Sequence, residues 1–101
     1  MPSHKISQVI LALQAKEDLQ DILQYTEQTW DASQRRRYAS LLAKAIKSLY
    51  ITPLLGHKSV VLGRNYRILH VGKHLAVYKV EEDVVTIVRV LHQNRDVERH
   101  L

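Results

Sequence analysis

The first half of the chain carries two stretches in which apolar residues recur every three or four positions. Residues 15–30 form the first stretch, and residues 34–49, which end shortly before Pro53, form the second. This spacing places the apolar side chains on one face of a helix. Asp31 and Gln34 stand where a reciprocal capping pair would begin the second helix. Because only a few residues separate the stretches, we expect two antiparallel neighbouring helices, an αα-hairpin.

The remaining apolar positions favour strands. Residues 5–13 are rich in β-branched residues and predict a short first strand. After Gly56 the apolar positions alternate, which is typical of half-buried strands. This alternation predicts strands over 65–71, 74–80 and 84–91, a hairpin turn at Gly72-Lys73, and an optional strand over 59–62. The order indicates one α+β domain over residues 1–101: an antiparallel sheet, made of the N-terminal strand and a C-terminal meander, with the αα-hairpin packed on one face.

Length and composition exclude several classes of protein. A chain of 101 residues is too short for a two-domain enzyme or a classical dinucleotide-binding fold. The absence of cysteine excludes a disulfide framework, a thiol nucleophile and a thiolate metal site. The longest apolar run, Val9 to Leu13, is too short for a membrane span or a secretory signal. We therefore expect a cytoplasmic protein with no membrane association.

Charge is distributed unevenly along the chain. Residues 32–79 contain ten Lys and Arg and no Asp or Glu, whereas the segments on either side carry more acids than bases. Such a basic surface attracts a polyanion or an acidic partner, and the alternative is a simple solubility bias. Three of these cations, Arg35-Arg36-Arg37, cannot form one patch, because successive helix residues point about 100° apart.

Few residues suggest catalysis or metal binding. Glu17, Asp18 and Asp21 form an acidic cluster, and a position near the start of the first helix, where the dipole favours acids, explains them without catalysis. His70 and His74 flank the predicted hairpin turn, and no Cys or nearby acid completes a set of ligands. We expect exposed strand histidines, no metal site and no cofactor.

The remaining candidates lie in the strands and at the end of the chain. Arg67 is in the middle of a predicted strand, and His92 and Arg95 follow the last one. On an open face of the sheet these three side chains could converge as phosphate binders or as a proton donor. The alternative is a set of local ion pairs that fixes the terminus, among Arg95, Asp96, Glu98 and Arg99.

Several segments together carry a family resemblance. Residues 18–30 are similar to a first helix, and residues 34–49, with Arg37-Tyr38 and Leu49, to a second. Residues 65–68, 74–80 and 88–96 are similar to the strands of a sheet. In this order and spacing they resemble the RelE/ParE toxin superfamily, and its ParE branch in particular, over nearly the whole chain.

The resemblance implies a type II toxin that is neutralised by an antitoxin encoded beside it. The ParE branch implies inhibition of DNA gyrase by binding, without catalytic residues. The implied partner is a ParD-like antitoxin with an acidic C-terminal tail, in a toxin–antitoxin hetero-oligomer. Aromatic and Arg side chains dominate binding energy, so we expect the antitoxin-binding residues to be Trp30, Arg36, Arg37 and Tyr38. The expected target-binding residues are Arg67, His92, Arg95 and Arg99.

Two alternative functions stay open. RelE-type relatives cut messenger RNA on the ribosome, and here the catalytic residues would be Arg67, His92 and Arg95. Two absences weigh against this reading: Lys58 is the only Lys from residue 48 to 72, and no Tyr lies after Tyr78. The weaker alternative is a non-enzymatic nucleic-acid-binding module, which requires steeply salt-dependent binding to bare DNA or RNA.

Overall fold

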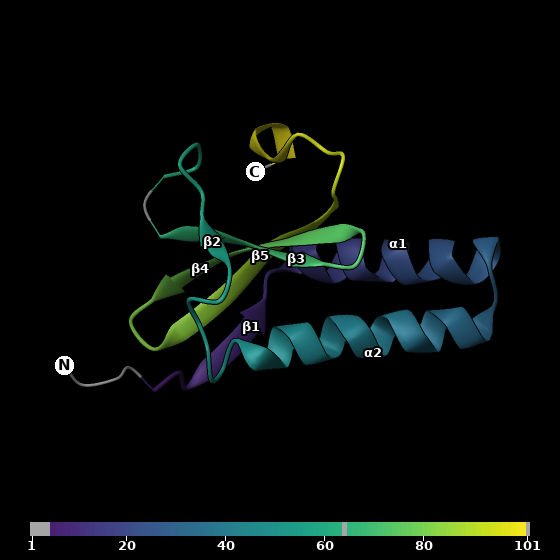
Figure 1. Cartoon of the computed structure of the whole chain (residues 1–101), viewed down its shortest axis with the longest axis horizontal. Helices are drawn as coiled ribbons and strands as arrows, with labels where there is room; N and C mark the ends of the chain where they lie inside the picture. Colours follow the sequence, from purple (N-terminus) through teal and green to yellow (C-terminus); the bar gives the residue numbers. More distant parts are fainter. Residues whose placement is uncertain (1–4, 64, 101) are drawn as a thin grey trace.

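An αα-hairpin covers one face of a five-stranded sheet and extends beyond it, as Figure 1 shows. The computed structural model describes residues 5–63 and 65–100. The helices are α1 (Leu13–Thr29) and α2 (Ala32–Ser48). The other elements are β1 (Gln8–Leu11), β2 (His57–Lys58), β3 (Tyr66–Val71), β4 (His74–Glu81), β5 (Val84–His92) and a short 3₁₀ helix, η1 (Val97–His100). Within the described residues, no helix is long and apolar enough to cross a membrane.

The predicted α+β fold is confirmed, with one difference in strand direction. The sheet order is β1-β5-β4-β3-β2, and β3, β4 and β5 form the expected antiparallel meander. The N-terminal strand β1 instead runs parallel to β5, with Gln8 opposite Val84 and Leu11 opposite Ile87. A parallel pair needs a long crossover between its strands, and here both helices and the rest of the meander supply it.

The predicted helices are confirmed, with small shifts at their ends. Asp31 caps α2, because its side chain accepts a hydrogen bond of 2.8 Å from the amide of Gln34. The predicted strand over 5–13 is too long, since only Gln8–Leu11 pair and α1 begins at Leu13. The first turn of α1 therefore contains no acid, and the explanation of Glu17, Asp18 and Asp21 as first-turn residues is wrong.

The prediction of an additional strand over 59–62 is also wrong. The strand that pairs with β3 is β2, and residues 60–62 form a turn. Two hydrogen bonds of 3.1 Å close it: the amide of Gly63 donates to the carbonyl of Ser59, and the amide of Leu62 donates to the Ser59 hydroxyl. Val60 is 94% exposed, so the apolar residues that suggested a strand do not face a core.

The core lies between the sheet and the two helices. Its largest fully buried side chains include Tyr78, Leu49 and Ile87. The Tyr78 hydroxyl donates to the carbonyl of Pro53 and accepts from the amide of Gly56, each at 2.8 Å. Burial raises the pKa of Tyr78. These two bonds fix the segment that leads from α2 into the sheet.

The turn between β3 and β4 is held against α2. Gly72 has a φ of +58°, and a Cβ at this position would lie 2.8 Å from the ring of Tyr38. Only glycine adopts this backbone conformation readily and leaves room for the ring. The Tyr38 hydroxyl also accepts a hydrogen bond of 3.1 Å from the amide of Lys73. The turn is thereby fixed beside α2, where it forms one wall of a groove.

Candidate functional site

A groove of about 550 Å³ separates the αα-hairpin from the β3–β4 turn and the end of β5. Its floor and walls are largely apolar and aromatic, and Trp30 at the end of α1 is 66% exposed. Arg37 and Lys73 add two cations to its edge. Its lining also includes Tyr25, Tyr38, Leu41, His74 and His92.

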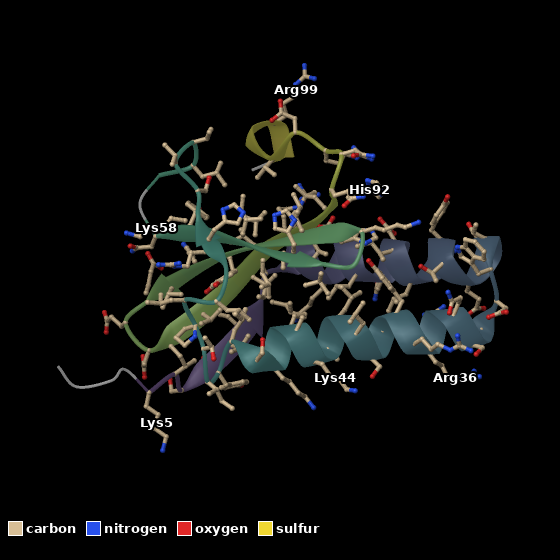
Figure 2. The ribbon with its side chains drawn as sticks, viewed as in Figure 1. Lys5, Arg36, Lys44, Lys58, His92 and Arg99 are labelled. Carbon is tan, nitrogen blue, oxygen red and sulfur yellow. The ribbon has the colours of Figure 1, made fainter. Side chains whose placement is uncertain are left out.

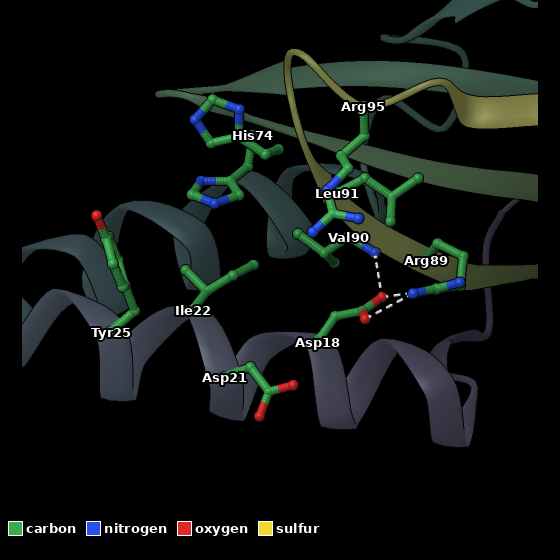
Figure 3. Close-up of a pocket in the computed structure, with 10 residues that line it drawn as sticks. Asp18, Asp21, Ile22, Tyr25, His74, Arg89, Val90, Leu91 and Arg95 are labelled. Carbon is green, nitrogen blue, oxygen red and sulfur yellow. Dashed lines mark hydrogen bonds and ion pairs between the residues drawn. The ribbon is translucent and has the colours of Figure 1, made fainter. Parts of the chain in front are cut away.

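A second hollow of about 330 Å³ continues the first along α1 (Figure 3). Both hollows are lined by Tyr25, His74 and His92, so they adjoin one another. The second hollow adds Asp18 and Asp21 from α1, together with Arg89, Val90, Leu91 and Arg95 from β5 and the segment after it. We refer to the two together as the helix–sheet groove. It offers room for an extended or helical segment of a partner chain.

An ion pair between Asp18 and Arg89 closes one end of the helix–sheet groove. The Asp18 carboxylate accepts from both Nε and Nη2 of Arg89, at 2.8 and 2.9 Å, and from the amide of Val90 at 2.9 Å. Both side chains are less than 20% exposed. The hydrogen bond to Asp18 raises the pKa of Arg89. Because β1 stops at the level of Ile87, the next part of β5 has a free edge, and Asp18 occupies it.

A chain of three ring side chains lies where the two hollows meet. The Tyr38 hydroxyl is 2.5 Å from Nδ1 of His74, and the rings of His74 and His92 meet edge to face with centroids 5.5 Å apart. Burial, and then the neighbouring His92, lower the pKa of His74. Burial raises the pKa of Tyr38. Both shifts favour the neutral forms of the two side chains. The Tyr38 hydroxyl also lies 3.4 Å from the carbonyl oxygen of Val71, to which it can donate.

Comparison with known proteins places the whole arrangement in a family. The sequence profile described as ParE toxin of type II toxin-antitoxin system, parDE, matches residues 9–97. The chain belongs to the ParE toxin family. It is 37% identical to Toxin ParE1 of Caulobacter vibrioides over 91 residues, which cover 90% of this chain and 94% of that protein. It is 33% identical to Toxin ParE1 of Mycobacterium tuberculosis over 96 residues, covering 94% of this chain and 98% of that protein.

A solved structure has the same fold. A chain in the structure of the chromosomal ParDE TA system from P. aeruginosa superposes with a TM-score of 0.75, at 17% sequence identity. The match covers 89% of this chain and 98% of that chain. At this identity the likeness shows a shared fold.

Three of the four expected antitoxin-binding residues of this ParE-family chain lie together. Trp30, Arg37 and Tyr38 all line the helix–sheet groove. Arg36 does not line it, and Figure 2 shows its side chain on the side of α2 that is turned away from α1. The separation follows from helical geometry, because neighbouring residues of α2 point about 100° apart.

The expected target-binding residues are only partly brought together. His92 and Arg95 line the second hollow, and Arg99 extends from η1 at the outer end of the molecule (Figure 2). Arg67 lies elsewhere: its guanidinium donates to the carbonyls of Gly56, at 2.6 Å, and Leu54, at 3.3 Å. The expected convergence of Arg67 with His92 and Arg95 is therefore wrong. The alternative of local terminal ion pairs includes Glu98, whose side chain lies outside the described part.

Two features of the site were missed by sequence reasoning. The pairing of Asp18 with Arg89 joins residues 71 positions apart, and neither residue belongs to a sequence motif that predicts the pair. The contact between Tyr38 and His74 spans 36 positions. The available signal was the placement of Asp18 on the apolar side of the α1 stripe beside Ile22, one helical turn away.

Proposed function

We propose that this ParE-family chain is a toxin that inhibits DNA gyrase by binding, and that a cognate ParD-like antitoxin neutralises it. The observation that carries this proposal within the family is the separation of Arg67 from His92 and Arg95. Acid–base cleavage of RNA needs its groups within hydrogen-bond reach of one substrate. The fold holds Arg67 opposite Tyr78 and His92 opposite His74, four residues apart along β4. At about 3.3 Å per strand residue, the two positions on β4 that these residues face lie ~13 Å apart along the strand.

The bonding of Arg67 supports the same reading. Its guanidinium is already committed to two backbone carbonyls, so it acts as a support for the segment after α2. Without Arg67, the remaining cations beside the helix–sheet groove are better suited to binding a partner than to cleaving a phosphodiester. For gyrase contact we favour the exposed residues His92, Arg95 and Arg99, which lie along the segment from the end of β5 to η1.

The helix–sheet groove supports a role in antitoxin binding. Its apolar lining and the exposed Trp30 fit an amphipathic segment, and Arg37 and Lys73 at its edge complement acidic side chains. An acidic tail that folds on contact would bury its apolar side against α1 and α2 and keep its carboxylates near these cations. In its neutralised form the chain would be part of a toxin–antitoxin hetero-oligomer in the cytoplasm, where gyrase acts.

Induction in living cells tests the target. The proposal predicts that producing the chain without antitoxin stops growth, lowers the negative supercoiling of a reporter plasmid and leaves mRNA ends unchanged. Co-production of the cognate antitoxin restores growth. Cut mRNA with normal plasmid supercoiling would replace the proposal by the ribonuclease alternative. In that case His92→Ala would abolish killing while the chain stays folded.

A further inference from the structure

We propose that His57 and His70 form a surface site for a divalent transition-metal ion that prefers imidazole ligands, with Zn²⁺ as the representative ion. The two histidines lie on adjacent antiparallel strands, β2 and β3. Their Nε2 atoms are 3.3 Å apart, and their rings are stacked with centroids 5.4 Å apart. The site is separate from the helix–sheet groove and from the proposed toxin activity.

The spacing of the two nitrogens matches the requirement of a tetrahedral ion. Zinc–imidazole bonds are about 2.0–2.1 Å long, so two ligands at a tetrahedral angle place their nitrogens about 3.3–3.4 Å apart. The observed Nε2–Nε2 separation of 3.3 Å falls in this range. Without an ion the same contact is a hydrogen bond between the two rings, which an ion bound by both Nε2 atoms would replace.

The ring of His57 is also oriented as a metal ligand. Its Nδ1 lies 3.3 Å from the carbonyl oxygen of Lys58. A carbonyl can only accept, so the tautomer of His57 that is protonated on Nδ1 donates to it and leaves the lone pair on Nε2, facing His70. Histidine ligands in metal sites are typically held by such a bond from the second ring nitrogen to a backbone carbonyl.

Two nearby cations, Lys58 and Arg67, lie on the face of the sheet opposite the histidines. His57 is opposite Ile68, two residues from His70, so both histidines share one face of the sheet. Lys58 and Arg67 are partners on the other face, where Arg67 bonds to the carbonyl of Gly56. That other face is the one that packs on the helices, because Leu69 belongs to it and contacts the core. The histidine pair is thus exposed on the face opposite α1 and α2.

Two coordination positions of the ion would remain open. In the described part of the chain no group of three or more His, Asp or Glu side chains is suitably placed to hold a metal. Residues 32–79, which contain both histidines, include no Asp or Glu that would add a carboxylate. Water, or a donor from a partner chain, would complete the coordination, as in other open zinc sites.

Zinc titration of the purified full-length chain, freed of any polyhistidine tag, tests the site. We expect one Zn²⁺ per chain, with the Nε2 resonances of His57 and His70 shifting together in nitrogen NMR of the imidazole rings. His57→Ala and His70→Ala should each weaken Zn²⁺ binding at least about tenfold, since loss of even an outer partner of a ligand costs that much. The matched control, His92→Ala, removes another exposed strand-end histidine and should leave the affinity unchanged.

Two results would overturn the proposal. One is that millimolar Zn²⁺ leaves both ring resonances of the wild-type chain in place. The other is that His57→Ala and His70→Ala, shown to be folded by circular dichroism, bind Zn²⁺ as the wild type does. The first readout uses the unaltered chain, so the test holds even where a variant fails to fold.

Discussion

At the scale of single residues, Tyr38 connects the helical layer to the sheet. Its hydroxyl lies 2.5 Å from Nδ1 of His74 on β4 and accepts from the amide of Lys73 in the β3–β4 turn. Its ring fills the space that the missing side chain of Gly72 leaves. One side chain thus positions the turn that forms a wall of the helix–sheet groove.

Removing the Tyr38 hydroxyl should destabilise the fold. Tyr38→Phe keeps the ring but leaves the Lys73 amide and the His74 imidazole without this partner. We expect the free energy of unfolding to fall by about 1–2 kcal/mol, measured by urea denaturation. Tyr25→Phe is the matched control, because Tyr25 is 67% exposed and should change stability little. Equal stability of the two variants would contradict this role of Tyr38.

Burial of His74 should make stability depend on pH. Its pKa is lowered in the folded chain, by burial and then by His92, so the unfolded chain binds the proton more tightly. The contribution of neutral His74 is therefore complete above the ordinary histidine pKa of about 6.5 and is lost as the pH falls below it. Urea midpoints at pH 7.5 and pH 5.5 measure the loss. His74→Gln, which cannot titrate, should show a smaller decrease, and an unchanged decrease would count against this cause.

At the scale of elements, the sequence pattern predicted those helices and strands whose formation depends on neighbouring residues. The two helices and the β3–β4–β5 meander follow from apolar periodicity, and the Asp31 cap of α2 follows from spacing alone. The strand over 59–62 was mispredicted because Val60 and Val61 are apolar yet exposed, in a turn that Ser59 closes. The parallel direction of β1 depends on how the entire chain is connected, which no short pattern encodes.

The candidate site divides in the same way. Trp30, Arg37 and Tyr38 follow from the α1 and α2 sequences, and the structure places them in one groove. The Asp18–Arg89 pair joins α1 to β5 across 71 positions and depends on where β1 stops. No signal within a helix or a strand reports such a contact, because its determinant is the free edge of β5.

Replacing Asp18 should destabilise the contact between α1 and β5. Asp18→Ala removes the carboxylate that accepts from the Arg89 guanidinium and the Val90 amide in a partly buried position. We expect the free energy of unfolding to fall by about 1.5–3 kcal/mol, the range for hydrogen bonds to charged groups, as measured by urea denaturation. Asp21→Ala is the control, since Asp21 is exposed and lies in the same hollow. Similar losses of stability in the two variants would contradict the view that Asp18 stabilises the fold by binding the free edge of β5.

At the scale of the whole molecule, the two sides of the sheet carry different features. The helical side holds the helix–sheet groove, with aromatic side chains and cations at its edge. The opposite side carries the His57–His70 pair. The acid-free segment of residues 32–79 supplies α2, the β3–β4 turn and most of β4, so its positive charge reaches the groove edge at Arg37 and Lys73. An acidic antitoxin tail would meet these cations first.

Antitoxin affinity should depend on the groove and much less on the rest of α2. Trp30→Ala should raise the Kd for the cognate antitoxin by about thirtyfold or more, the effect of losing an aromatic anchor worth about 2 kcal/mol. Arg37→Glu should also weaken binding, whereas Arg36→Glu, with the same charge change outside the groove, should weaken it less. Isothermal titration calorimetry at fixed salt measures all three. Equal effects of the two Arg variants would contradict this placement of the tail.

Gyrase inhibition by the purified chain is the most direct measurement of the central claim. The chain is mixed with gyrase, ATP and relaxed plasmid, and supercoiled and cleaved DNA are separated on a gel. The proposed function predicts loss of supercoiling or accumulation of cleaved plasmid, and recovery when the cognate antitoxin is added first. Unchanged supercoiling in the presence of excess, demonstrably folded chain would contradict it.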